Sequence, residues 1–210
     1  MRVRRVSSVD SYGDPAAPAW QEIPVEAIEM TPAPLGLQPT EYIQVSWDER
    51  DYGEIEEVST RAIHDGTAAA VHLSWASEKP SSGAGESFPD AAAVAFPVRG
   101  DPILMQMGSD DAPMQFIQWQ ASRKEARSVV AKGIGSSLAG EDTGQKAKAA
   151  WSAGRWSVVF SRLLGGGDNS AKLVPGEATQ IGFAVWNGSN EERAGIKAVS
   201  IEWTEFELEG

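Results

Sequence analysis

The fold class is indicated most clearly by residues 61–76, whose sequence is Arg-Ala-Ile-His-Asp-Gly-Thr-Ala-Ala-Ala-Val-His-Leu-Ser-Trp-Ala. Every second residue from Val71 to Trp75 is large and apolar, which is the period of a β-strand with one buried face. The preceding step Asp65-Gly66 is a preferred sequence for the two-residue turn of a β-hairpin. We therefore predict a hairpin whose strands are residues 54–64 and 67–76.

The same period of two returns along much of the remaining chain. It predicts further strands at residues 42–47, 91–98, 114–120, 155–162, 180–186 and 198–203. These segments are short, are bounded by Gly, Pro, Asn and Asp, and are not separated by long helical patterns. Such a series is typical of an all-β fold, and we expect an antiparallel β-sandwich with short helices and long loops.

Four internal segments depart from the strand pattern. Residues 123–132 and 145–151 contain Ala, Lys and Arg, and we predict a short helix in each. Residues 79–88 and 164–170 are rich in Gly, Ser or Pro, and we expect them to form long loops.

The N-terminal region has a composition of its own. The first forty residues contain five prolines between Pro15 and Pro34, which favours an extended arm packed across the sandwich or onto a partner. We therefore divide the chain into an N-terminal arm, residues 1–40, and a single β-sandwich domain, residues 41–210.

The charge and hydropathy of the chain exclude several classes of function. The chain has 210 residues, with 18 Lys and Arg against 30 Asp and Glu, and a net charge of -12. This acidic balance argues against binding to nucleic acid or to an anionic membrane surface, because both need clustered cations. No stretch approaches the ~20 apolar residues of a membrane span. The residues after Met1 lack the apolar core of a secretory signal.

The absence of cysteine is equally restrictive. It excludes disulfides, thiolate zinc sites, Fe–S ligation and covalent attachment of haem. His64 and His72 are the only histidines, so a multi-histidine metal site cannot form. The chain also lacks a phosphate-binding Gly-rich loop, a nucleophile elbow and an acidic calcium loop, and we identify no catalytic residues.

Several short blocks occur in an informative order, although none of them is specific alone. They are Phe96-Pro97, Met105-Gln106-Met107-Gly108, Trp119, Trp156 with Ser161-Arg162, Phe183 to Gly188, Glu192 to Gly195, and Lys197 to Ser200. Their order resembles that of the haem-binding gamma subunit of ethylbenzene dehydrogenase and its relatives in dimethylsulfide dehydrogenase, selenate reductase and chlorate reductase. The resemblance covers about residues 20–206.

This resemblance implies electron transfer by the chain rather than catalysis by it. It implies a β-sandwich domain that binds one haem b without a covalent bond, within a heterotrimer. The partners would be an alpha subunit with a molybdenum cofactor and a beta subunit with Fe–S clusters, and the external acceptor a c-type cytochrome or another carrier. Relatives act in the bacterial periplasm after export with a partner subunit, and a cytoplasmic complex is also compatible with the sequence.

In the family that the chain resembles, the haem iron has one Met and one Lys as axial ligands. The Met corresponds to Met107 or alternatively to Met105, which we expect on the same strand face. The Lys corresponds to Lys172 or alternatively to Lys197. A lysine can bind iron only as the neutral amine, whereas its unperturbed pKa is about 10.4, so the site must favour deprotonation.

We expect the haem pocket between the faces of the two sheets. Trp119, Trp156 and Trp186 could line it, although tryptophans on alternating strands usually belong to the core. His72 is a rival axial ligand, and we interpret it as a neutral, hydrogen-bonded surface residue.

Two other functions remain open from the sequence. The eight Trp residues could stack on sugar rings if they are exposed, and the chain would then be a carbohydrate-binding β-sandwich. Alternatively, it is a structural subunit that has lost its cofactor. A visible spectrum of the purified protein separates these functions from haem binding.

Overall fold

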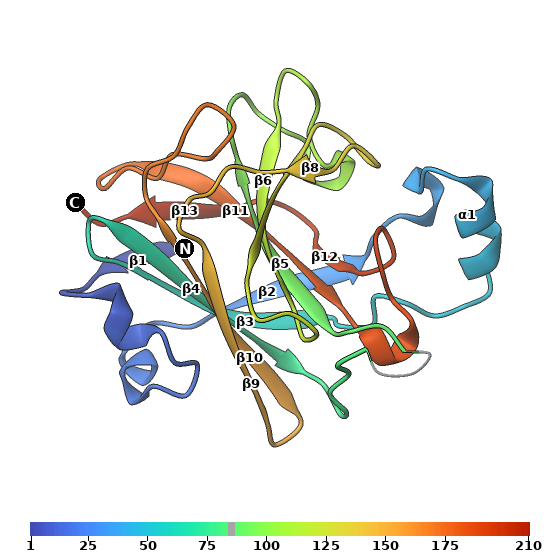
Figure 1. Cartoon of the computed structure of the whole chain (residues 1–210), viewed down its shortest axis with the longest axis horizontal. Helices are drawn as coiled ribbons and strands as arrows, with labels where there is room; N and C mark the ends of the chain where they lie inside the picture. The colour runs from blue at the N-terminus through green and yellow to red at the C-terminus, as the bar shows by residue number, and fades with distance from the viewer. Residues whose placement is uncertain (84–86) are drawn as a thin grey trace.

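The hairpin at Asp65-Gly66 is present in the computed structural model, which describes residues 1–83 and 87–210 (Figure 1). The Asp65 carboxylate accepts hydrogen bonds of 2.9 Å from the backbone N–H groups of Thr67 and Ala68. Gly66 adopts a φ of +86°, a conformation that glycine allows without a steric penalty. The turn thus joins β3 (Glu57–His64) to β4 (Ala68–Ala76), as the sequence predicts.

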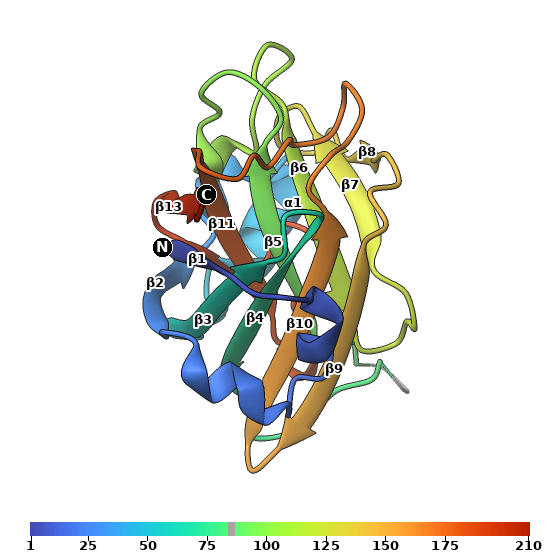
Figure 2. The ribbon, with the colours of Figure 1, turned by 90° about the vertical axis from the view of Figure 1, so that its left-hand side faces the viewer.

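The strands form two layers that are joined at their edges. They are β1 (Arg2–Arg5), β2 (Glu26–Pro32), β3, β4, β5 (Ala91–Pro97), β6 (Met114–Gln120), β7 (Arg127–Ala131), β8 (Leu138–Ala139), β9 (Lys146–Ser152), β10 (Arg155–Leu163), β11 (Ala178–Trp186), β12 (Ala198–Ser200) and β13 (Thr204–Leu208). One layer has the order β9-β10-β4-β3-β2, and the other has the order β8-β7-β6-β5-β11-β12 (Figure 2). Because β12 also pairs with β2, the layers share an edge. The predicted antiparallel β-sandwich is confirmed.

Large apolar side chains fill the space between the two layers. Trp119 of β6 lies edge-on to Trp75 of β4 and Trp156 of β10, with ring centroids 6.3 Å and 4.9 Å apart. The indole nitrogen of Trp156 donates a hydrogen bond of 2.9 Å to the carboxylate of Asp90. These tryptophans belong to one continuous buried cluster. The space between the layers, where we expected the pocket, is therefore a packed core.

Residues 42–47 form a helix, and the predicted strand there is wrong. The helix α1 (Glu41–Trp47) begins after Thr40, whose hydroxyl accepts a hydrogen bond of 3.4 Å from the backbone N–H of Ile43. Such a cap satisfies one of the free N–H groups of a helix end. Trp47 at the other end is buried beside Tyr52, with ring centroids 5.7 Å apart.

The two short helices predicted at residues 123–132 and 145–151 are also wrong, because both segments contain strands. β7 pairs with β6, and β9 pairs with β10 along its whole length. The turn between β9 and β10 has positive φ at both Ala153 and Gly154, which suits a tight hairpin. Pairing with neighbouring strands therefore overrides the helix propensity of Ala and Lys.

The first forty residues contribute two strands to the sandwich. β1 runs parallel to both β3 and β13, and β2 pairs antiparallel with β3 and β12. Between β1 and β2 lie the 3-10 turns Val9–Tyr12 and Pro18–Glu22, and a third, Leu35–Leu37, follows β2. The segment thus ends next to β12, a strand from the far end of the chain.

The remaining predictions concern the last strand and two loops. The predicted strand 198–203 is shorter, since β12 ends at Ser200 and β13 begins at Thr204. The loop at 164–170 contains no helix or strand, as predicted, and the loop at 79–88 includes residues 84–86, which lie outside the described residues. In the described ranges no helix is long and apolar enough to cross a membrane.

Candidate functional site

A pocket lies on the outer face of the layer that contains β5, β6, β7 and β11. Side chains alternate along β5, so Val94 and Phe96 belong to the core whereas Ala93 and Ala95 line the pocket. On β11, Ala184 lies directly opposite Ala93 and also lines the pocket. Because these outward residues are small, the middle of this sheet face is a flat, apolar floor.

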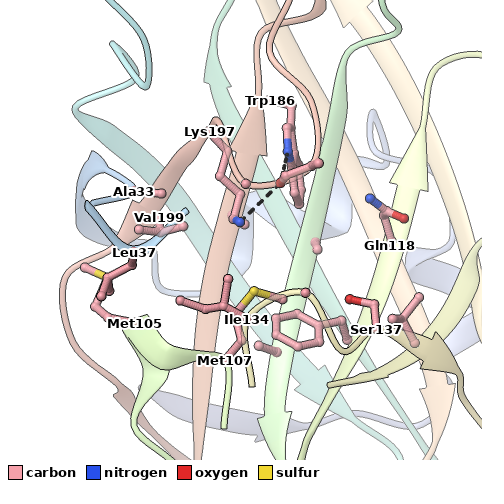
Figure 3. A pocket seen from close by; sticks show the side chains of 18 of the residues that line it. Ala33, Leu37, Met105, Met107, Gln118, Ile134, Ser137, Trp186, Lys197 and Val199 are labelled. Atoms are coloured by element: carbon pink, nitrogen blue, oxygen red, sulfur yellow. Dashed lines mark hydrogen bonds between the residues drawn. The ribbon is translucent and has the colours of Figure 1, made fainter. Parts of the chain in front are cut away.

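Four segments build walls around this floor. They are residues 33–43, the 3-10 turn Leu104–Gln106 with Met107, residues 134–139, and residues 194–197. The pocket, which Figure 3 shows from close by, is partly open to solvent. Its volume is about 410 Å³. No Asp or Glu lines it among the described residues, and the charged side chains that do are Arg127 and Lys197.

Both candidate methionines line this pocket, on a turn rather than on the strand face that we expected. Met107 ends the 3-10 turn with a φ of 57°, in the left-handed region that is uncommon for residues other than glycine. Its carbonyl accepts a hydrogen bond of 3.0 Å from the backbone N–H of Gly133, which ties the turn to the loop after β7. In Figure 3, Met107 extends into the middle of the pocket, whereas Met105 lies at its side.

Lys197 is buried on the opposite wall of the same pocket, with an exposed fraction of 8%. Its amine nitrogen lies 3.3 Å from the carbonyl oxygen of Ala194 and 5.4 Å from the ring centre of Trp186. The Ala194 carbonyl also accepts a hydrogen bond of 3.1 Å from the indole of Trp186. Among the described residues no carboxylate forms an ion pair with this amine. Burial lowers the pKa of Lys197 to about 8, so its amine loses its proton at a lower pH than an ordinary lysine does.

The loop that carries Lys197 is held by a buried carboxylate. Glu192 accepts hydrogen bonds of 2.8 Å from the backbone N–H groups of Gly53 and Asn187. Burial raises the pKa of the Glu192 carboxyl group, although these hydrogen bonds oppose that effect. Farther along, Ala194 adopts a φ of 50°, and this turn directs its carbonyl toward Lys197. The position of the amine is thus fixed by the backbone around it.

The structure does not bring Lys172 or Trp119 to this pocket. Lys172 is exposed on the loop after β10 and lines a separate hollow with Arg99 and Asp168. Trp119 lies in the core between the layers. The candidate residues that share one pocket are therefore Met105, Met107, Lys197 and Trp186.

The rival ligand His72 lies elsewhere in the molecule. It is buried on β4, not on the surface as we interpreted it, and its Nε2 lies 3.3 Å from the carbonyl oxygen of Pro15. Burial, with a smaller contribution from Arg61, lowers the pKa of His72 to about 4. His72 is therefore a neutral residue under the N-terminal segment and does not line the pocket.

The tryptophans do not form an exposed sugar-stacking platform. All eight lie in the part of the chain that the structure describes, and Trp151 is the exposed one, at 37%. Six are buried and Trp203 is half-buried. Trp186, one of the buried ones, lines the pocket.

Most residues of the pocket walls were not predicted from the sequence. Gln38 joins two of them, since its amide donates a hydrogen bond of 3.2 Å to the carbonyl of Gly195. Ile134 and Ser137 come from the loop after β7, which lies beyond the helix that we predicted at residues 123–132. The sequence signal for these walls is their composition: Pro32, Pro34 and Pro39 occur in or next to one wall, and Gly133 and Gly135 in or next to another. Such residues indicate loops but not a pocket.

Comparison with solved structures identifies the fold. A family 9 carbohydrate-binding module from Caldicellulosiruptor kristjanssonii, solved with glucose, has a TM-score of 0.58 and 12% identity, covering 100% of this chain and 95% of that one. A protein from Bacteroides uniformis, named as carbohydrate-binding, has a TM-score of 0.54 and 11% identity, covering 100% and 98%. At this identity the likeness concerns the β-sandwich alone.

Sequence relatives are more informative. The respiratory nitrate reductase heme subunit ORF7, so named in Haloferax mediterranei, is 32% identical over 97% of this chain and 71% of its own length. The chlorate reductase subunit gamma of Ideonella dechloratans is 28% identical over 96% and 83%. The dimethylsulfide dehydrogenase subunit gamma of Rhodovulum sulfidophilum is 24% identical over 90% and 73%. The family model described as ethylbenzene dehydrogenase matches residues 17–146 and 138–198. The chain therefore belongs to the ethylbenzene dehydrogenase family.

Proposed function

We propose that this chain is the haem-binding, electron-transfer subunit of a multi-subunit oxidoreductase. Relatives named as heme or gamma subunits of reductases and a dehydrogenase support this proposal. A molybdenum-containing subunit and an Fe–S subunit would perform the chemistry and exchange electrons with this chain. The absence of cysteine is consistent with this division, because the chain cannot ligate an Fe–S cluster through thiolates.

The observation that carries the proposal is the buried amine of Lys197 in a pocket that also contains Met107. A buried cation without an acidic partner is unfavourable, and burial lowers its pKa. The amine donates a hydrogen bond of 3.3 Å to the carbonyl of Ala194, lies 5.4 Å from the ring centre of Trp186, and belongs to a residue that lines the cavity. A neutral amine is the form of lysine that can bind iron. The residue is thus arranged as a ligand donor rather than as a structural cation.

The size and lining of the pocket support the proposal that it binds a non-covalent haem b. Its volume of about 410 Å³ lies within the range of pockets that bind small molecules and cofactors. Its floor of Ala93, Ala95 and Ala184 is apolar, and burial of an apolar ring in such a pocket is favourable. When bound, haem supplies a one-electron carrier, and with two protein ligands its iron has no open position for a substrate.

We assign Lys197 and Met107 as the axial ligands. Lys197 replaces Lys172, which lies outside the pocket. Met107 is preferred to Met105 because its side chain extends to the middle of the pocket in Figure 3. Its left-handed backbone also supports the choice, since strained residues cluster at ligand sites.

Titration of the purified chain with hemin tests the function. We expect a low-spin haem spectrum that develops with one equivalent and responds to reduction by dithionite. The Lys197→Leu variant should lose this spectrum, whereas Lys172→Leu serves as the matched control and should keep it. A wild-type chain that binds no haem would contradict the proposed function, and a spectrum that depends on Lys172 would contradict the assignment of the lysine.

A second pair of variants separates the two methionines. Leucine has nearly the volume of methionine but no sulfur, so it preserves packing and removes the ligand. We expect Met107→Leu to change the low-spin spectrum and Met105→Leu to leave it unchanged. The reverse result would transfer the assignment to Met105.

We further propose a basic c-type cytochrome as the external acceptor and the periplasm as the location. The net charge of -12 favours attraction of a basic protein at low ionic strength. The rate of electron transfer to such a cytochrome should therefore fall as salt is added. A rate independent of salt would argue for a different acceptor, and recovery of the complex from the cytoplasmic fraction would contradict the location.

A further inference from the structure

One row of side chains crosses the pocket floor from strand to strand. The pairing register places Val199 opposite Ala184, Ala184 opposite Ala93, Ala93 opposite Gln118, and Gln118 opposite Arg127. All five line the pocket. The row is apolar from β12 to β5 and becomes polar on β6 and β7. The pocket therefore has an apolar end near Lys197 and a polar end at Gln118 and Arg127.

The polar end has donors that the protein itself does not use. Within the described residues, neither the Gln118 amide nor the Arg127 guanidinium forms a hydrogen bond or an ion pair. A neighbouring arginine differs, since Arg123 donates a hydrogen bond of 2.8 Å to the side-chain carbonyl of Gln120. Arg127 is exposed and Gln118 is half-buried, so on these adjacent strands both side chains offer donors to water or to a ligand in the pocket.

The charge of the pocket indicates the sign of its ligand. The chain has 30 acidic against 18 basic residues, yet both charged residues that line the cavity are basic. A guanidinium presents two parallel N–H donors that match the two oxygens of a carboxylate. The side-chain amide of Gln118 can add a further donor. The polar end is therefore suited to a carboxylate.

We infer that Gln118 and Arg127 form a carboxylate subsite that binds the propionate groups of the haem, an inference that rests on the proposed function. Adjacent strands lie roughly 4.8 Å apart, so β6 and β7 are about 14 and 19 Å from β12, which Lys197 directly precedes. The subsite and the proposed axial lysine thus occupy opposite ends of the pocket. This arrangement orients the ring, because its charged edge can be paired only at the β6–β7 end.

The test compares hemin with its dimethyl ester, in which both carboxylates are neutral. Each porphyrin is titrated into the wild-type chain and into Arg127→Gln, with affinity measured by absorbance. We expect the wild type to bind hemin about tenfold more tightly than the ester, a preference of about 1.4 kcal/mol. In Arg127→Gln this preference should largely disappear. Gln118→Leu should reduce it by a smaller factor, about threefold.

Arg123→Gln is the matched control, because it removes the same charge from the same hairpin outside the pocket lining. It should retain the wild-type preference for hemin. If the wild type binds both porphyrins equally, or if Arg127→Gln retains the preference, the carboxylate subsite is refuted while haem binding stands. If the wild type binds neither porphyrin, the proposed function fails and the inference fails with it.

Discussion

Two buried cations, Arg162 inside the sandwich and Lys197 on its outer face, differ in how their donors are used. Arg162 is 4% exposed, and its guanidinium donates hydrogen bonds to the side chain of Gln115 and to the carbonyls of Leu163 and Ala171. Lys197 is 8% exposed, and its amine donates one hydrogen bond, of 3.3 Å, to the carbonyl of Ala194. Among the described residues neither cation has a carboxylate partner.

The difference separates a structural role from a binding role. Arg162 fastens the loop after β10 to the core, since it contacts both Gln115 and Ala171, and Gln115 in turn accepts from the Ala171 N–H. Burial lowers the pKa of Arg162 to about 10, and its hydrogen bonds compensate part of the cost of burial. Lys197 has less of this compensation, with one hydrogen bond of 3.3 Å, and it borders a cavity. A buried cation that has few hydrogen bonds and borders a cavity indicates a ligand site.

Replacement of Arg162 should change the stability of the protein more than any other substitution considered below. Arg162→Met removes the donors but leaves the Gln115 side-chain oxygen and the Ala171 carbonyl in the core. We expect the free energy of unfolding to fall by about 4 kcal/mol, as when one partner of a buried charged network is deleted. Urea denaturation measures this change. A loss below about 1 kcal/mol would remove the distinction between the two cations.

Lys197→Leu should stabilise the haem-free protein, whereas Arg162→Met should destabilise it. Haem affinity should fall by about 100-fold, or about 3 kcal/mol, with loss of an axial bond. The haem-free variant should become more stable by about 1 kcal/mol, because an unpaired buried cation is replaced by an apolar side chain. Hemin titration and urea denaturation measure the two effects. A variant that is destabilised without haem would show that Lys197 has a structural role.

The pH dependence of the unfolding free energy of the haem-free protein also tests whether Lys197 is buried. Lys197 has a folded pKa of about 8 against an ordinary value of 10.5, so the unfolded chain binds more protons between these values. The unfolding free energy should therefore rise with pH from about 8 to 10.5, by roughly 2 to 3 kcal/mol. Lys197→Leu is the reference, since other groups titrate equally in both proteins. A constant difference between the two proteins over this range would contradict the burial of the amine.

The smallest effects compare adjacent alanines on opposite faces of β5. Ala93→Leu fills part of the pocket floor, so haem affinity should fall about tenfold while the stability of the haem-free protein changes by less than about 1 kcal/mol. Ala92→Leu overfills the packed core and should lower the unfolding free energy by about 1 to 3 kcal/mol. Equal effects of the two substitutions on stability would mean that the outer face is as tightly packed as the inner one.

Features with a local physical cause were predictable from the sequence. The hairpin at Asp65-Gly66 is fixed by turn chemistry and by the alternation of the following residues, and both occur within a few positions. The failures had competing local signals. Residues 42–47 alternate like a strand, yet the cap at Thr40 favours the helix α1. Residues 145–151 have helix-forming composition, yet they pair with β10 as β9.

The site was only partly predictable, because burial is a property of the whole fold. The resemblance offered two lysines, and nothing within the sequence distinguishes their surroundings. Lys197 is buried because residues 33–39 and the loop after β11 close over it. Lys172 remains exposed because its neighbours on both sides, Ala171 and Leu173, take the buried positions of that segment. The flat floor likewise depends on the register of four strands, which no local pattern specifies.

The walls of the pocket also fix when it can exist during the life of the chain. Gln38 and Gly195, which are 157 positions apart, meet at one wall, and β12 closes the sheet against β2. A ribosome adds roughly 5–20 residues per second and releases the chain from its N-terminal end first. The nascent protein therefore has no complete pocket until its last strands emerge. If the pocket binds haem as proposed, the haem should therefore bind after β11 and β12 have been synthesised, and a chain truncated before β11 should not bind it.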